Sequence, residues 1–149
     1  MSGINMKAGE KLAVVGTIDP QTVVNTELFS DVVDMSKFHQ ALAVALLGNM
    51  AAETIDFKAY SCDSDGSNAA ALRSATQLAA HASNNDNKQI VIGVRAEDLI
   101  ASGKQYCKFG LVTGNSTGGP AAVLVLGVDA RATPASDIDL STVVEIKQS

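Results

Sequence analysis

Two consecutive segments near the C-terminal end restrict the possible folds most strongly. In residues 105–113, apolar side chains alternate with polar or small ones from Cys107 to Leu111, which is the period-two pattern of a half-buried strand. Residues 120–128 are apolar at nearly every position, so this strand is expected deep in a sheet with cover on both faces. The turn-rich residues 114–119 join the two segments. The pattern therefore predicts a β-hairpin inside a β-sandwich.

The composition predicts one domain with an aliphatic core. The chain has 149 residues, of which 46% are hydrophobic but only 4% aromatic, with no Trp. A chain of this length buries roughly two-thirds of its unfolded surface and needs no metal or disulfide to fold. We expect residues 1–10 to form a flexible N-terminal arm and residues 11–132 the β-sandwich domain. Residues 133–149 are expected to form a C-terminal tail, in which residues 143–146 have the pattern of an edge strand.

The charge argues against two classes of partner. A formal net charge of −5, with 11 scattered Lys and Arg residues, does not provide the clustered positive surface that tracks a nucleic-acid backbone. No apolar run approaches the roughly 20 residues that cross a membrane. The first ten residues lack the apolar core of a secretion signal. We therefore expect no nucleic acid and no membrane as partners, and synthesis in a cytoplasm.

The order of extended segments predicts the fold class. About eight such segments are separated by Gly, Asn, Asp and Pro turns, without regular alternation of strands and helices. This pattern predicts a mainly β protein, an antiparallel β-sandwich that is jelly-roll-like, with at most one short helix. The main expected strands lie at residues 11–18, 29–35, 41–47, 54–60, 89–95, 105–113 and 120–128.

Three segments have patterns that differ from those of most of the main expected strands. Residues 41–47 alternate Ala with Leu and Val, and their length favours a strand, expected next to residues 54–60 as an antiparallel neighbour. Residues 69–82 have the spacing of a short amphipathic helix but fit a strand with a bulge equally well. Residues 97–102 are expected to form a single helical turn ended by Gly103.

The alternation also predicts which side chains are buried between the sheets. The expected core consists of Leu42, Val44, Leu46, Ile55, Phe57, Ile90, Ile92, Phe109, Leu111, Val123 and Val125.

The two cysteines and one acidic turn are the first candidates for chemistry. Cys62 and Cys107 are widely separated, without a CxxC spacing, and are expected to be buried free thiols. Residues 63–67 resemble the first half of a calcium loop, but the closing Glu is missing, so an ordinary Asp/Gly turn is the better interpretation. We predict no metal site and no cofactor.

The remaining polar residues form no recognisable catalytic set. His39 and His81 have no sequence-defined partner for acid–base work, and Ser116 lies in a flexible loop without a nucleophile elbow. Residues 114–119 lack the Gly-Lys-Ser/Thr ending of a phosphate loop. Glu97 and Asp98 suit the start of a helical turn, where carboxylates are favoured. No catalytic residue is predicted, and we expect the chain not to be an enzyme.

The order of several segments resembles a group of small proteins of tailed bacteriophages, the capsid decoration or cement proteins. The resemblance covers residues 22–134 and consists of patterns of residue class. It is carried by residues 33–38, Ile55-Asp56-Phe57-Lys58-Ala59-Tyr60, residues 90–99, Lys104-Gln105-Tyr106-Cys107-Lys108 and residues 127–134.

The resemblance implies a structural role in the virion. A protein of this group decorates and stabilises the capsid by binding the lattice of the major capsid protein, and the resemblance implies a homotrimer at the capsid surface. A head–tail joining or tail component of the virion is the first alternative. A small-molecule or carbohydrate-binding sandwich is the second, disfavoured because Tyr60 and Tyr106 are the only tyrosines and there is no Trp to stack on a sugar.

Overall fold

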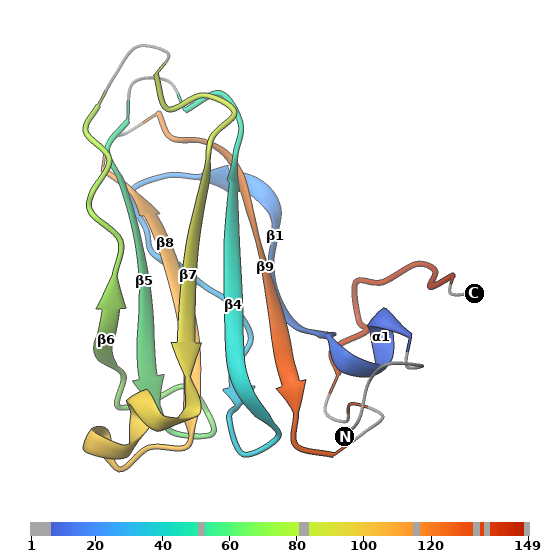
Figure 1. Ribbon diagram of the computed structural model, residues 1–149. Helices are drawn as coiled ribbons and strands as arrows, with labels where there is room; N and C mark the ends of the chain where they lie inside the picture. Colours follow the sequence, from blue (N-terminus) through green and yellow to red (C-terminus); the bar gives the residue numbers. More distant parts are fainter. Residues whose placement is uncertain are drawn as a thin grey trace.

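The chain folds into two antiparallel sheets packed face to face (Figure 1). The computed structural model describes residues 7–50, 53–80, 84–114, 117–132, 135 and 138–147. Strands account for 51% of the described residues and helices for 8%. The strands are β1 Ala13–Val23, β2 Leu28–Phe29, β3 Val33–Asp34, β4 Phe38–Leu47, β5 Ile55–Cys62, β6 Ala70–Ser74, β7 Gln89–Arg95, β8 Tyr106–Thr113 and β9 Gly119–Ala130. The helical turns are α1 Ala8–Lys11 and the 3₁₀ helix η1 Ala96–Ser102.

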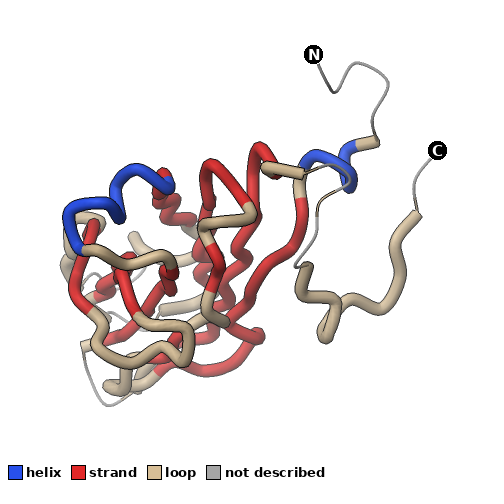
Figure 2. Tube along the Cα trace, turned by 90° about the horizontal axis from the view of Figure 1, so that it is seen from below, coloured by secondary structure: helices blue, strands red, loops and turns tan. Residues whose placement is uncertain are grey.

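The strand order confirms the predicted jelly-roll sandwich. One sheet has the order β1-β9-β4-β7, and the other has the order β2-β8-β5-β6, with β3 also paired to β8. Figure 2 shows the two layers from below. Consecutive long strands repeatedly lie in opposite sheets, so most strand pairs join residues that are distant in sequence. We call the β1-β9-β4-β7 sheet the front sheet and the other the rear sheet.

Two predicted strand pairs are wrong. The expected hairpin of β8 and β9 does not form, because β8 pairs with β5 in the rear sheet while β9 pairs with β1 and β4 in the front sheet. The expected neighbours β4 and β5 also lie in different sheets. Alternation along a strand indicates which side chains share a face, but it does not indicate which strand lies alongside.

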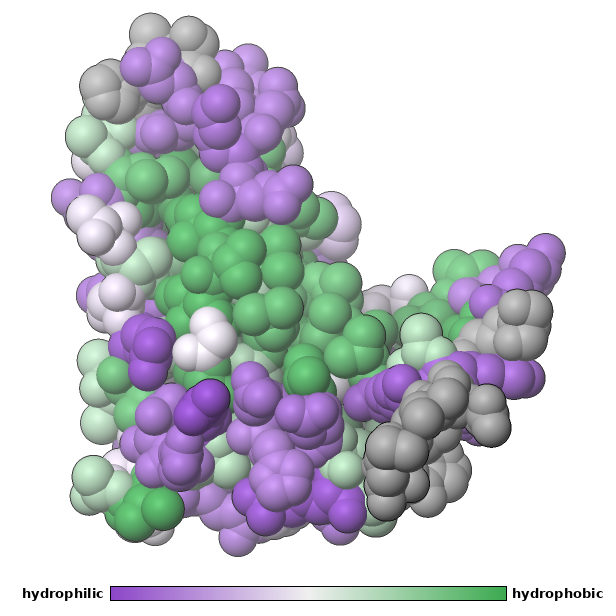
Figure 3. All heavy atoms as spheres, viewed as in Figure 1, coloured by the Kyte–Doolittle hydropathy of each residue, from purple (hydrophilic) through white to green (hydrophobic). Residues whose placement is uncertain are grey.

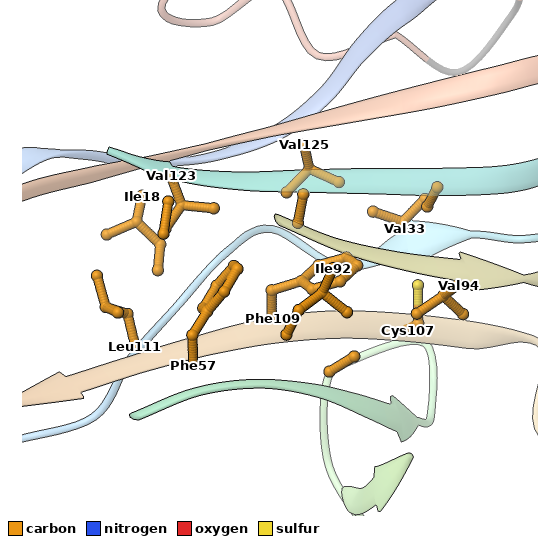
Figure 4. Close-up of a cluster of buried hydrophobic side chains, with 14 of the residues drawn as sticks. Ile18, Val33, Phe57, Ile92, Val94, Cys107, Phe109, Leu111, Val123 and Val125 are labelled. Atoms are coloured by element: carbon orange, nitrogen blue, oxygen red, sulfur yellow. The ribbon is translucent and has the colours of Figure 1, made fainter. Parts of the chain in front are cut away.

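Most of the predicted core is confirmed. The side chains between the sheets include the rings of Phe57 and Phe109, with centroids 6.2 Å apart, and Figure 4 shows how the two sheets enclose them. The predicted core residues that are buried are Ile55, Phe57, Ile92, Phe109, Leu111, Val123 and Val125.

Strand β4 presents the face opposite to the predicted one. Ala41, Ala43 and Ala45 point into the core, whereas Leu46 is 45% exposed. Leu42, Val44 and the predicted core residue Ile90 are only half-buried. Small inward side chains leave space for the phenyl rings of the rear sheet, since a close-packed interior fixes total volume rather than the size of each residue. The prediction was therefore wrong for the β4 residues, although β4 is a strand as expected.

The alternatives left open for residues 69–82 are settled for the described residues 69–80. These contain strand β6, which pairs with β5 across a bulge, so the strand-and-bulge alternative is correct and the helix is not. The turn η1 forms as predicted, and Gly103 ends it with a left-handed φ of 68°. No helix in the described ranges is long and apolar enough to cross a membrane.

Helix α1 and the described part of the C-terminal tail lie beside the edge strand β1 (Figures 1 and 2). Ala135 N donates to Glu10 O at 3.3 Å, and Asp139 N donates to Val14 O at 2.7 Å. After Asp139 the chain makes a turn in which Val143 N donates to Leu140 O at 3.1 Å, and Ser141 and Thr142 of this turn line a hollow with Thr17 and Leu28 of the sandwich. Residues 143–146, with the expected pattern of an edge strand, pair with no strand in the part of the chain that the structure describes.

Candidate functional site

The polar residues considered as catalytic candidates are not brought together. His39 is exposed at the start of β4, while His81 and Ser116 lie outside the described residues. Asp98 Oδ2 accepts a hydrogen bond from Arg95 N at 2.9 Å, so this carboxylate caps the first turn of η1 as predicted. Glu97 forms an exposed ion pair with Arg95 at 2.9 Å. These acidic side chains have a local structural role.

The acidic turn after β5 is held by its own hydrogen bonds. Asp63 Oδ2 accepts from Asn68 Nδ2 at 2.7 Å, and Asp63 Oδ1 pairs with the ammonium of Lys104. The contacts to Asn68 and Lys104 lower the pKa of Asp63. Asp65 accepts from Ser67 N at 2.9 Å. Across the described residues, no three His, Cys, Asp or Glu side chains are grouped to hold a metal ion.

A buried carboxylate ties together the loops at one end of the sandwich. Glu53 is only 1% exposed, and its Oε1 accepts a hydrogen bond from Gly118 N at 2.8 Å. Glu53 Oε2 is buried without a hydrogen-bond partner among the described residues. Gly118 has a φ of 67°, and a Cβ there would lie 2.1 Å from Val23 O, so the close approach requires glycine. Nothing in the sequence indicated this contact, because Glu53 and Gly118 are 65 residues apart.

The outer face of the rear sheet carries a closed cluster of polar and aromatic side chains. Tyr60 Oη donates to the Glu27 carboxylate at 2.7 Å, and the Tyr60 ring meets Phe29 edge-on with centroids 5.7 Å apart. Burial and the Glu27 carboxylate raise the pKa of Tyr60 well above its ordinary value. Lys108 Nζ lies 3.9 Å from the Phe29 ring centroid and donates to Gly66 O. Tyr60 is thus engaged within the chain, which weakens the case for a sugar-stacking platform.

The outer face of the front sheet is apolar instead. Leu46 and Val91 are 45% and 55% exposed, and they lie on neighbouring strands among half-buried aliphatic side chains. Figure 3 shows this face as a continuous hydrophobic area over β4, β7 and β9. We define the apolar face as Val14, Leu42, Val44, Leu46, Val91, Ala122, Leu124, Leu126 and Val128.

Two carboxylates meet where the C-terminal tail leaves the sandwich. Asp31 accepts from Thr17 N at 3.1 Å, and Asp139 accepts from Ser141 N and Ser141 Oγ at 3.0 and 2.6 Å. Burial raises the pKa of Asp31, and the Asp139 carboxylate beside it acts in the same direction. The hydrogen bonds from Ser141 lower the pKa of Asp139. The residues are far apart in sequence, and no local pattern predicted their contact.

No protein-family model matches the chain, and neither does any curated protein sequence. Similar solved structures do exist. The SPBc2 prophage-derived protein YomS is 15% identical, with a TM-score of 0.50, and the match covers 86% of this chain and 99% of YomS. A chain from the disulfide-linked pili of Bacillus endospore appendages is 11% identical, with a TM-score of 0.46, covering 85% of this chain and 98% of that chain. The module CBM32-1 of a Clostridium perfringens family 31 glycoside hydrolase is 19% identical, with a TM-score of 0.34, covering 75% and 74% of the two chains.

The likeness to YomS shows the fold alone. The match to YomS spans nearly the whole of that protein, so the shared architecture is a complete domain.

Proposed function

We propose that this chain is a non-enzymatic structural protein of a tailed-phage virion that decorates the capsid by binding the lattice of the major capsid protein. The observation that carries the proposal is the jelly-roll sandwich shared with a prophage-derived protein over 86% of this chain. The sequence resemblance to capsid decoration proteins points in the same direction. The proposed partners are the major capsid protein and further copies of this chain in a trimer, and the proposed location is the outer surface of the virion.

The chemistry of the described surface supports a binding role over a catalytic one. The acidic side chains of residues 63–67 and of η1 are engaged in local hydrogen bonds and ion pairs. The apolar face of the front sheet, by contrast, is an exposed hydrophobic patch, and proteins use such patches to bind other proteins. A structural protein of an assembly needs such a surface, and it needs no titratable residue held near a reacting bond.

Sedimentation with phage heads tests the proposal. Purified protein is mixed with undecorated heads and, separately, with free capsid subunits, and the bound copies are counted after sedimentation. We expect saturation at many copies spread over the shell and little binding to free subunits, because a site shared between neighbouring subunits exists only in the lattice. Heads that already carry their decoration protein are the control, since their sites are filled.

The alternatives give different results in the same experiment. Binding of about a dozen copies at one vertex would support a head–tail joining component instead. Absence of co-sedimentation at every salt concentration would contradict both virion roles. Binding to a soluble oligosaccharide panel in the absence of heads would favour the carbohydrate-binding alternative.

A further inference from the structure

A hollow at one end of the front sheet contains most of the chain's arginine side chains. The sequence has only three arginines, and two of them, Arg95 and Arg131, line this hollow. The other polar side chains that line it are His39, Gln40 and Glu97. The volume of the hollow is about 300 Å³, at the lower end of the range for ligand pockets. The chain has a formal net charge of −5, so two guanidinium groups against one carboxylate give the hollow a charge opposite to that of the chain.

The strand order of the front sheet brings these residues together. Strand β4 lies between β9 and β7 and runs antiparallel to both, so the ends of β7 and β9 lie beside the start of β4 (Figure 1). Gln40 lies opposite Arg95 in the β4–β7 pair. Arg131 N donates a hydrogen bond to Lys37 O at 2.9 Å, which holds the backbone of Arg131 beside the start of β4. Backbone pairing therefore sets the position of both arginines, although they are distant in sequence.

Most of the hydrogen-bond donors of the two guanidinium groups are free. A guanidinium group has five N–H donors. Among the described residues, Arg95 uses Nη1 in an ion pair with Glu97 Oε1 at 2.9 Å, and the side chain of Arg131 forms no hydrogen bond or ion pair. Both side chains of the Arg95–Glu97 pair are 64% exposed, and an exposed ion pair contributes little to stability. An incoming anion can therefore replace Glu97 at Arg95 at little cost in free energy.

The neighbouring acidic side chains have partners of their own. Asp98 pairs with Arg73 at 3.4 Å, and Asp129 accepts a hydrogen bond from Gln40 Nε2 at 3.2 Å. Neither of these carboxylates lines the hollow. Among the described residues, Glu97 is therefore the one acidic side chain that an incoming anion would meet there.

We propose that this hollow binds an oxyanion, either free phosphate or the carboxylate of an acidic side chain, with the guanidinium groups of Arg95 and Arg131 as its main ligands. The planar guanidinium group presents paired N–H donors that match the oxygens of these anions. The imidazole of His39 lies on the same hollow and supplies a further donor. The site goes beyond the proposed function, and its tests use the purified chain alone, so a failure to bind phage heads would leave it standing.

Nuclear magnetic resonance of the arginine side chains gives the first test. The protein is titrated with sodium phosphate in exchange for sodium chloride at constant ionic strength, and the Nε–H signals of the three arginines are followed. We expect the signals of Arg95 and Arg131 to shift and to saturate together. Arg73 is the internal control, because it is paired with Asp98 outside the hollow, and its signal should not shift. Shifts that grow linearly at all three arginines, or no shift at Arg95 and Arg131, would overturn the proposal.

Substitution of Arg131 separates binding in the hollow from a general effect of charge. Arg131→Gln is expected to bind phosphate about tenfold more weakly than the wild type, because hydrogen bonds to a charged group are lost. Arg73→Gln removes the same charge outside the hollow and should leave the affinity unchanged. Equal affinities of the wild type and Arg131→Gln, or equal losses in the two variants, would contradict the site.

A titration with glutarate distinguishes the two sources of the anion, because its carboxylates have the chemistry of acidic side chains. In either case the saturable shifts are expected at Arg95 and Arg131. Tighter binding of glutarate than of phosphate would assign the hollow to a carboxylate of a protein partner, and tighter binding of phosphate would assign it to the free ion. Saturable binding of neither anion would overturn the proposal.

Discussion

The ring of Phe38 fills the space that a side chain at position 127 would occupy. A Cβ built on Gly127 would lie 2.6 Å from Phe38 Cδ1 and Cε1, closer than such atoms approach in folded proteins. Phe38 and Gly127 are both buried, and they lie at the start of β4 and near the end of β9. The contact fixes how these two strands cross the end of the core.

Replacement of Gly127 by Ala is therefore expected to destabilise the protein by about 1–3 kcal/mol through overpacking. The control is Gly93→Ala in β7, where the nearest atom to the added Cβ, Leu42 Cδ1, is 3.9 Å away. That change is expected to be neutral or slightly stabilising, because Ala has fewer unfolded conformations than Gly. Urea unfolding of both variants provides the measurement, and equal midpoints would contradict the contact.

Truncation of Phe57 tests the position of the core. Phe57 is fully buried against Phe109, so Phe57→Ala is expected to cost about 3–5 kcal/mol from lost burial and the cavity left behind. Phe29→Ala is the matched control, because Phe29 is more than one-third exposed on the outer face of the rear sheet. We expect the control to cost clearly less. Similar losses for the two variants would mean that the interior is not centred on Phe57.

The sequence was sufficient to predict which side chains of a strand are buried where one face is apolar and the other polar. It was insufficient where both faces are apolar. Phe57 alternates with the polar Asp56 and Lys58, and that contrast predicted its burial correctly. In β4, both Ala43 and Val44 are apolar, so hydrophobicity alone did not identify the inner face. The inner face is decided by volume, because the rear sheet contributes the large phenyl rings.

Contacts between residues that are distant in sequence could not be predicted either. The sequence predicted β8 and β9 as strands, but their partners depend on strand pairs formed by distant parts of the chain. The contacts of Glu53 with Gly118 and of Asp31 with Asp139 also join distant loops, and no spacing rule applies to them. By contrast, the η1 turn was predicted correctly because its signals, two acidic residues and Gly103, are local.

The two thiols are expected to be unreactive in the folded protein. Cys62 and Cys107 are both buried and unbridged, and burial raises the pKa of Cys107 to about 12. A thiol attacks alkylating reagents as the thiolate, so at mildly alkaline pH neither the ionisation state nor access favours reaction. Labelling by iodoacetamide, read by mass spectrometry, is expected only after unfolding. A melting temperature that drops strongly with reductant would instead indicate a disulfide, worth about 2–4 kcal/mol.

The Asp31–Asp139 pair is expected to make the docking of the tail depend on pH. Asp31 has a folded-state pKa above the unfolded value of 3.8, so its contribution to stability is present at low pH and is lost as the pH rises through the folded pKa. Asp139 has a lowered pKa, so its contribution is present above 3.8 and is lost only as the pH falls below that value. Above pH 3.8, the change in the stability of the folded protein with rising pH therefore comes from Asp31, and it lowers the stability.

Asp31→Asn is expected to remove that unfavourable change, because a neutral amide costs less to bury than a carboxylate and carries no charge to repel Asp139, while its oxygen still accepts from Thr17 N. Relative to the wild type, the variant should gain thermal stability as the pH rises above 3.8, with the gain reaching a plateau once Asp31 is ionised. Asp65→Asn is the control, since Asp65 is an exposed carboxylate in the turn after β5. Hydrogen exchange at Asp139 N, which donates to Val14 O, reports whether the tail itself is held more firmly. A gain that is the same at every pH, or one without slower exchange at Asp139, would show that repulsion between Asp31 and Asp139 does not control the docking of the tail.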